Sequence, residues 1–328
     1  MSRLTIVTAM LVACTTVSSD PTHVTSAMPA ASPRTTAPGA SHLVFRPTKA
    51  ALPVALQRSV AVWDGTIAYV AGGLDAAGTT VGGVYSIDPA SGKVASLGSL
   101  AQPVHDAAAS MIGGMIYVFA GGAGSGTETV QTFDPSTGTS RVVGHMPVAL
   151  SDLASARIGT TTYLVGGYDG VRPRREIYAT TDGTSFSRVG ELPVGLRYPA
   201  VTVAGGVIVI AGGQGASGPT RGVYTFDPIS GRTELLGELP VPLAHASAFT
   251  LGGVTYVAGG RDAADQALTV VSAIDPSTGR VKPRPSLARP VADAAVAAGS
   301  HATLLIGGWG TTTLRQVLLA TLHPMAAT

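Results

Sequence analysis

The stretch GVTYVAGG at residues 253–260 ends an apolar run with two glycines, and the same ending recurs along the chain. Related endings are AYVAGG at 68–73, YVFAGG at 117–122, YLVGG at 163–167, IVIAGG at 208–213 and LLIGG at 304–308. Successive doublets begin 45 to 49 residues apart. A constant period of this length indicates an array of structural repeats, each one supersecondary unit.

Composition limits the class of protein that carries these repeats. The chain has 328 residues, 12% of them charged, with a formal net charge of +2, 42 Gly and 22 Pro. No Lys/Arg cluster forms a basic stripe, so we expect no nucleic-acid partner. Short apolar runs bounded by Gly, Pro and Asp-Pro predict many strands and few helices.

The first 14 residues, MSRLTIVTAMLVAC, predict export and lipid attachment. Arg3 supplies the positive charge, and the apolar run that follows is too short to span a bilayer. The LVAC ending resembles the bacterial lipobox, which implies cleavage after residue 13 and acylation of Cys14, the only cysteine. Several acyl chains on one residue give stable membrane attachment. The alternative is an ordinary secretory signal with an incidental cysteine.

Residues 14–42 are rich in Ser, Thr, Pro and Ala and cannot bury enough apolar surface to fold. We therefore predict a disordered tether at 14–42 and a folded domain at 43–323. A short tail remains at 324–328. We expect a monomer, held outside the cytoplasm on the cell membrane.

Each repeat reads as four antiparallel strands. In residues 98–144, the runs DAAASMI, MIYVFA, TVQTFD and TSRVVG are separated by turn residues, and the last turn is DPSTG. The first strands are rich in Ala and Ser, as strands crowded around a central axis must be. This taper favours radial packing over a linear stack.

The last repeat lacks a fourth strand, because the chain ends soon after its third run at 314–322. Residues 42–53 resemble the fourth-strand segment at 231–240, and both lead to Leu-Pro. We predict that residues 43–46 supply the outer strand of the last blade and remove the weakest edge of the ring.

These features resemble the kelch-type β-propellers, a family that includes the central domain of galactose oxidase. The resemblance rests on the six doublets, on the Y-x-x-D-P pattern at Tyr85 and Tyr224, and on the period near 50. The family's tryptophan at the start of the fourth strand is absent. The implied fold is an all-β, six-bladed propeller of four-stranded blades, closed by the N-terminal strand.

The resemblance implies a ligand-binding face formed by two sets of loops. The first set leads into the innermost strands and contains Arg58, His105, Asp106, Asp152, Arg197, Tyr198, His245 and Asp293. A ring of mixed charge at a channel mouth suits a sugar or a carboxylate. The alternative is that these groups pair with one another and with channel water.

The second set of loops follows the glycine doublets. Its candidates are Tyr168, Arg172, Arg174, Arg175, Arg261 and Trp309. Arginine forks and aromatic faces suit sugars and carboxylates. The alternatives are solvated loops for the arginines and packing between blades for Trp309.

No cofactor or metal is predicted. The seven histidines show no metal-ligand spacing, and the lone cysteine precedes the domain, so the cysteine-crosslinked tyrosine of copper oxidases cannot form. No nucleophile elbow, phosphate loop or dinucleotide fingerprint occurs in the required context.

Three functions remain open. The first is a non-catalytic module that binds a glycan, a peptide or an envelope protein. The second is a sugar-modifying enzyme similar to the kelch propellers that interconvert sialic acid anomers or epimers. Its first candidates for the acid/base group and the arginine clamp are His245, Asp152 and Arg197. The third is a purely architectural envelope protein. The absence of a nucleophile–base constellation favours the first.

Overall fold

The glycine-terminated runs form the second strands of six small antiparallel sheets. The computed structural model describes residues 41–122 and 126–324, and the predicted signal peptide, Cys14 and residues 14–40 of the predicted tether lie outside these ranges. Within the described ranges no helix is long and apolar enough to cross a membrane. The all-β prediction is confirmed.

The first three blades follow the predicted four-strand order. Blade 1 contains β2 (Val60–Trp63), β3 (Ala68–Ala71), β4 (Gly83–Ile87) and β5 (Val94–Ser99). Blade 2 contains β6 (Ala108–Ile112), β7 (Met115–Phe119), β8 (Thr127–Asp134) and β9 (Thr139–Leu150). Blade 3 contains β10 (Ala154–Ile158), β11 (Thr161–Val165), β12 (Glu176–Thr180) and β13 (Ser187–Glu191).

The remaining blades repeat this order, except that blade 4 has an additional short strand and blade 6 takes its outer strand from the N-terminal segment. Blade 4 contains β14 (Ala200–Ala204), β15 (Val207–Ala211), the short β16 (Gln214–Gly215), β17 (Gly218–Asp227) and β18 (Arg232–Leu243). Blade 5 contains β19 (Ser247–Leu251), β20 (Val254–Ala258), β21 (Val271–Ile274) and β22 (Val281–Arg284). Blade 6 contains β23 (Ala295–Ala298), β24 (Ala302–Ile306), β25 (Gln316–Pro324) and, as its outer strand, β1 (Ser41–Ala51).

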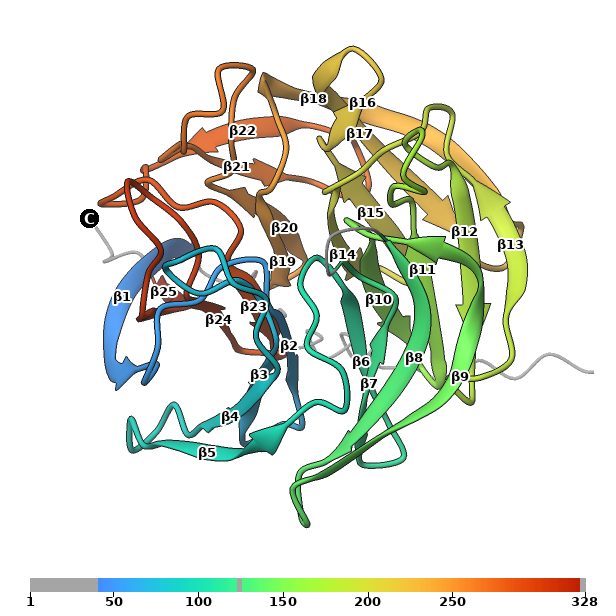
Figure 1. The fold of residues 1–328 in the computed structure, drawn as a ribbon. Helices are drawn as coiled ribbons and strands as arrows, with labels where there is room; N and C mark the ends of the chain where they lie inside the picture. The colour runs from blue at the N-terminus through green and yellow to red at the C-terminus, as the bar shows by residue number, and fades with distance from the viewer. Residues whose placement is uncertain (1–40, 123–125, 325–328) are drawn as a thin grey trace, which may run out of the picture. The chain divides into compact units, whose positions relative to one another are not determined.

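The six first strands surround a common axis (Figure 1). Each contacts the first strand of the next blade, and β23 returns to β2, so the ring is closed. Larger side chains fill the spaces between blades, where Phe133, Phe226 and Phe249 are fully buried. Radial packing buries both faces of each sheet, and the predicted six-bladed propeller is confirmed.

Strand β1 closes the ring as the sequence predicts. It pairs antiparallel with β25, with Leu43 opposite Leu322 and Arg46 opposite Leu319. The strand begins at Ser41, so it includes the last two residues assigned to the tether. The N-terminal segment of the domain thereby covers the edge of the C-terminal strand.

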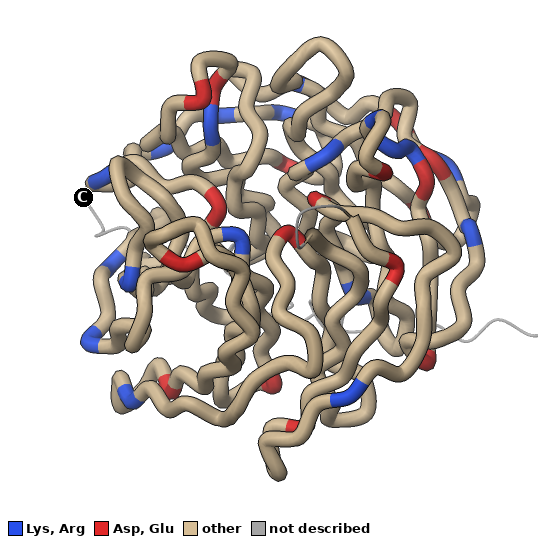
Figure 2. Tube along the Cα trace, in the orientation of Figure 1, with Lys and Arg blue, Asp and Glu red and all other residues tan. Residues whose placement is uncertain are grey.

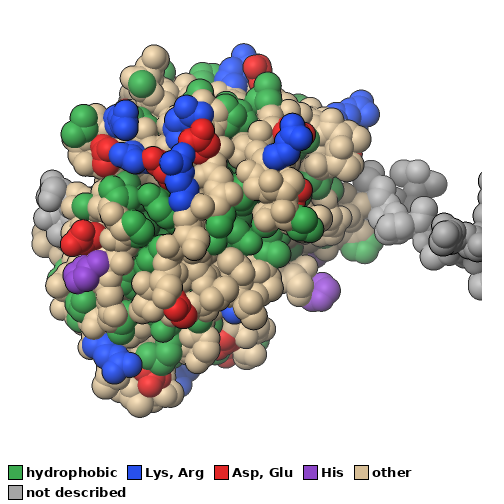
Figure 3. Space-filling view, turned by 90° about the vertical axis from the view of Figure 1, so that its right-hand side faces the viewer, with side chains coloured by type: hydrophobic (Ala, Val, Ile, Leu, Met, Phe, Trp, Pro, Cys, Tyr) green, Lys and Arg blue, Asp and Glu red, His purple; other side chains and the backbone are tan. Residues whose placement is uncertain are grey.

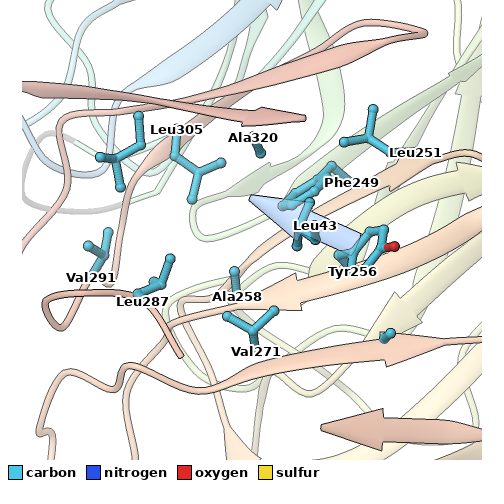
Figure 4. Close-up of a cluster of buried hydrophobic side chains, with 12 residues drawn as sticks. Leu43, Phe249, Leu251, Tyr256, Ala258, Val271, Leu287, Val291, Leu305 and Ala320 are labelled. Atoms are coloured by element: carbon cyan, nitrogen blue, oxygen red, sulfur yellow. The ribbon is translucent and has the colours of Figure 1, made fainter. Parts of the chain in front are cut away.

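Leu43 anchors this closing strand in the core between blades 5 and 6 (Figure 4). Its side chain lies in a cluster with Phe249 and Tyr256 of blade 5 and with Leu305 and Ala320 of blade 6. Phe249 and Ala320 are fully buried, and Leu43 is buried as well. The closing strand therefore contributes apolar contacts to two blades, besides its ladder of hydrogen bonds.

The glycine doublets join neighbouring blades. In blade 5, Gly259 and Gly260 have φ values of +68° and +100°, and the Gly260 N–H donates to the Val291 carbonyl of the next blade at 2.8 Å. A Cβ on Gly259 would lie 1.9 Å from that carbonyl oxygen. The doublet thus supplies a left-handed bend and close backbone approach, both of which glycine permits.

Blade 2 departs from the doublet pattern. Its positive-φ pair is Ala120 and Gly121, at +56° and +101°, in place of the predicted Gly121–Gly122. Gly122 instead pairs with His105 in an isolated bridge, as the residue after the doublet does in other blades. The bend is set by strand register, since Phe119 stands opposite Ala108 just as Ala71 stands opposite Val60.

Candidate functional site at the channel mouth

Six residues at the entrances to the inner strands share one unusual backbone conformation. All have φ between +51° and +62°, a region that residues other than glycine seldom adopt. One comes from each blade, and the set is Arg58, Asp106, Asp152, Tyr198, His245 and Asp293. We call these residues the mouth ring.

The mouth ring is closed by backbone hydrogen bonds. Each N–H donates to the carbonyl of the mouth-ring residue in the preceding blade, over distances of 2.8 to 3.3 Å. The Arg58 N–H donates to Asp293 at 3.0 Å, which joins blade 1 to blade 6. The six bonds together hold the backbone in this strained conformation. Strained backbone that is held by its surroundings often occurs at functional sites.

The mouth ring surrounds a small cavity at one end of the central channel. The cavity has a volume of about 140 Å³ and is lined by all six mouth-ring residues. The channel beyond it encloses about 500 Å³ and is lined largely by Ala, Val, Ser and Thr, with Trp63 and Arg157 toward its far end. Figure 2 shows acidic and basic residues near the centre of the ring.

Tyr198 is the centre of the side-chain network. Its hydroxyl donates to Asp106 Oδ2 at 3.2 Å and accepts from Arg58 Nη1 at 3.3 Å and Arg197 Nη2 at 3.2 Å. Its ring stacks on the His245 imidazole, with centroids 3.6 Å apart. Two guanidinium groups therefore converge on one phenolic oxygen.

Arg58 and Arg197 retain unused donors. Arg58 Nη1 contacts Asp106 Oδ2 at 3.1 Å, while Arg58 Nε lies 3.6 Å from Asp293 Oδ1, beyond hydrogen-bond reach. Arg197 forms an ion pair with Asp152, and its guanidinium lies 4.2 Å from the Tyr168 ring centroid. Both Nε atoms are buried and have no hydrogen-bond partner among the described residues. The two arginine side chains are 24% and 25% exposed.

Arg261, in contrast, is fully engaged. Its Nε and Nη2 donate to Asp293 Oδ2 at 2.9 and 2.6 Å, and its Nη1 donates to both Asp265 oxygens. The guanidinium lies 4.4 Å from the Trp309 ring centroid, and the side chain is 9% exposed. Arg261 and Trp309 thus support Asp293, whose other oxygen contacts His245 Nδ1 at 2.6 Å.

Two mouth-ring carboxyls are shifted in opposite directions. Burial raises the pKa of Asp106 to about 7, helped by the Asp152 and Asp293 charges and opposed by Arg58. Burial acts on Asp293 in the same sense, but its hydrogen bond with His245 and the nearby cationic groups lower the net pKa. Burial and the Arg58 charge lower the pKa of His105. The site therefore holds one carboxyl that titrates near neutrality and one that stays ionised.

Three candidate arginines belong to a different place, the loop of blade 3 at residues 168–176. Arg174 pairs with Asp169 at 2.8 Å and with Glu176. Its hydrogen bonds lower the pKa of Glu176 to about 2, and, despite partial desolvation, the Arg172 backbone N–H together with Arg174 lowers the pKa of Asp169 to about 2. Arg175 Nε donates to the Leu192 carbonyl, and Arg172 is exposed. On the side of the molecule that carries β12 and β13, basic and acidic side chains lie next to one another (Figure 3).

Several partners of the candidates were not predicted. Thr80 Oγ1 lies 2.9 Å from His105 Nδ1, and Asp265 pairs with Arg261. Asp265 stands four residues after Arg261, so the sequence spacing could have predicted this pair. Thr80 lies 25 residues before His105, and nothing in the local sequence indicates their contact. Among the described residues, no group of three or more His, Cys, Asp or Glu is placed to hold a metal ion.

Comparison with known proteins agrees with this architecture. Residues 242–288, which cover blade 5, match the Kelch motif. No curated protein matches the sequence. A solved structure titled "Structure of YjhT" has a TM-score of 0.74 at 17% identity and covers 83% of this chain and 99% of that chain, which concerns the fold alone. The expected kelch resemblance is confirmed, and residues 41–122 and 126–324 form a six-bladed β-propeller whose fifth blade carries a Kelch motif.

Proposed function

We propose that this protein is an extracytoplasmic binding module, anchored to the membrane through Cys14, that captures a carboxylate group of a glycan or peptide at the channel mouth. The observation that carries the proposal is the convergence of Arg58 and Arg197 on the Tyr198 hydroxyl. Both side chains are about one quarter exposed, so a ligand can reach the guanidinium groups from the solvent. Arginine binds carboxylates through paired, charge-assisted hydrogen bonds.

The cavity sets the size of the group that enters. A volume of about 140 Å³ accepts a carboxylate and part of a sugar ring, while the rest of the ligand remains outside. The aromatic ring of Tyr198 already holds Arg58 in position, and the rings of Tyr168 and Tyr198 hold Arg197. Pre-positioned donors reduce the conformational entropy lost on binding.

The first test is titration of the full-length protein with glucuronate, with glucose as the neutral reference. The double variant Arg58→Gln, Arg197→Gln is expected to weaken glucuronate binding about tenfold or more, because charge-assisted hydrogen bonds contribute about 1.5–3 kcal/mol each. The control is Arg188→Gln, since Arg188 lies on β13, is 54% exposed and pairs with Glu191.

Equal affinity of the double variant and the wild type for glucuronate contradicts this proposal. Binding of glucose as tightly as glucuronate also counts against it, because a neutral sugar gains nothing from the guanidinium charges. Failure to bind either sugar, combined with intact folding, favours an architectural protein.

A sugar-modifying enzyme is the second candidate, and one observation favours it. His245 is oriented by Asp293 at 2.6 Å, and Asp293 is in turn held by Arg261, while Asp106 titrates near neutrality. Pairs of groups with oppositely shifted pKa values are typical of acid–base catalysis. Conversion of a sugar during the same titrations, followed by NMR, distinguishes an enzyme from a binding module.

The anchor is tested separately. Cys14→Ser is expected to abolish lipid labelling and release the protein from membranes, because no acyl chain can then be attached. Ser19→Ala is the matched control, being a small change in the same segment that spares the thiol. Unchanged membrane association of Cys14→Ser indicates another mode of localisation.

A further inference from the structure

The charges at the channel mouth are matched one to one. Three carboxylates are buried there, namely Asp106, Asp152 and Asp293, with side-chain exposures of 6%, 2% and 2%. Three guanidinium groups face them: Arg58 contacts Asp106, Arg197 contacts Asp152, and Arg261 contacts Asp293. An anion that enters this site therefore competes with an internal carboxylate.

Asp106 has the weakest hold on its arginine. Arg58 Nη1 divides its contacts between Asp106 and Tyr198, at 3.1 and 3.3 Å. Asp293 instead keeps His245 and two donors of Arg261, whose side chain is 9% exposed. An incoming carboxylate reaches Arg58 and Arg197 more readily than Arg261. The contact of Arg58 with Asp106 is longer than that of Arg197 with Asp152, so the carboxylate displaces Asp106 first.

Loss of Arg58 leaves Asp106 in an unfavourable environment. The remaining groups that face it are the Tyr198 hydroxyl at 3.2 Å, His105 Nε2 at 3.8 Å, and the negative charges of Asp152 and Asp293. A buried carboxylate without a cationic partner becomes protonated, because burial penalises the ionised form. The proton comes from the solvent.

Resting on the proposed function, we propose that carboxylate binding at the channel mouth displaces Asp106 from Arg58 and is coupled to uptake of one proton by the Asp106 carboxyl. The free carboxyl already titrates near pH 7 with Arg58 beside it. Removing that favourable charge raises its pKa further in the bound state. Binding is therefore strongest below pH 7 and weakens as the pH rises above it.

Calorimetry of the full-length protein with glucuronate, in buffers of different ionisation enthalpy, measures the protons taken up. At pH 7.5 we expect about 0.8 proton per bound ligand, because a carboxyl with a pKa near 7 is about one quarter protonated beforehand. Affinity is expected to fall about eightfold between pH 7.5 and 8.5, from the same titration.

Asp106→Asn is expected to eliminate both effects and to bind at the low-pH level throughout. Asparagine tolerates the positive φ at this position, and thermal melting checks that the variant folds. Asp152→Asn and His105→Gln test the neighbouring titratable groups and should retain proton uptake. Glu191→Gln, a change at a 48% exposed carboxylate on β13 that also pairs with an arginine, is the matched control and should behave as wild type.

The outcomes separate this proposal from the proposed function. Glucuronate binding without proton uptake overturns the proton coupling and leaves the binding module intact. Uptake that persists in Asp106→Asn but disappears in His105→Gln assigns the proton to His105 and also overturns it. Absence of glucuronate binding in every variant and the wild type overturns both.

Discussion

Deletion of Ser41–Ala51 is expected to abolish the folded ring, because β1 covers the open edge of β25 and buries Leu43 between two blades. Truncating one buried leucine costs about 2–5 kcal/mol. Removing the whole strand also removes its hydrogen bonds to β25, so the stability lost is expected to be comparable to the total of about 5–15 kcal/mol for a typical domain. Circular dichroism and size-exclusion chromatography of the deleted chain measure the loss.

A circular permutant serves as the control. Ser41 stands opposite Pro324, so a four-residue turn like Pro135–Gly138 of blade 2 can join residue 324 to residue 41. This chain starts at Leu52 and ends at Ala51, and all four strands of blade 6 become consecutive. We expect it to fold with a melting temperature near that of residues 41–328. A deleted chain that folds as well as the permutant contradicts the role assigned to β1.

Gly260→Ala is expected to lower the free energy of unfolding by about 4 kcal/mol, because two costs add at this position. Its φ of +100° is strained for any residue with a Cβ. That Cβ would also lie 2.7 Å from the Ala244 carbonyl oxygen and 3.0 Å from Ala246 Cβ. The urea midpoint of the variant, compared with that of the wild type, measures the combined loss of stability.

Gly65→Ala isolates the conformational cost. Gly65 has a φ of +105°, almost the same as Gly260, but a Cβ there meets no atom within 4 Å. We expect a loss of about 2 kcal/mol, from backbone strain alone. If both variants lose the same stability, close backbone approach is not the reason for glycine at the second position of the doublets.

Much of the fold follows from local sequence signals. The glycine doublets, Asp-Pro turns and small-residue runs each mark a feature that one repeat needs by itself, so their recurrence predicts the blades. The missing fourth strand of the last repeat predicts closure, since an unpaired strand edge must be covered. Blade 2 shows the limit of this reasoning: the GG letters at 121–122 do not reveal that Ala120 takes the bend, because register with Ala108 sets it.

The sequence alone determined the repeat and the residues that stand at the entrances to the inner strands, because these follow from local signals that recur in each unit. It also predicted the closing strand, from the fourth strand that the last repeat lacks. Only the tertiary structure decided which of the entrance residues meet. Arg58 and Tyr198 are 140 positions apart and touch because six blades close around one axis. Arg174 has the same chemistry as Arg58 in the sequence, yet Asp169 and Glu176 occupy its donors, while Arg58 opens onto the cavity.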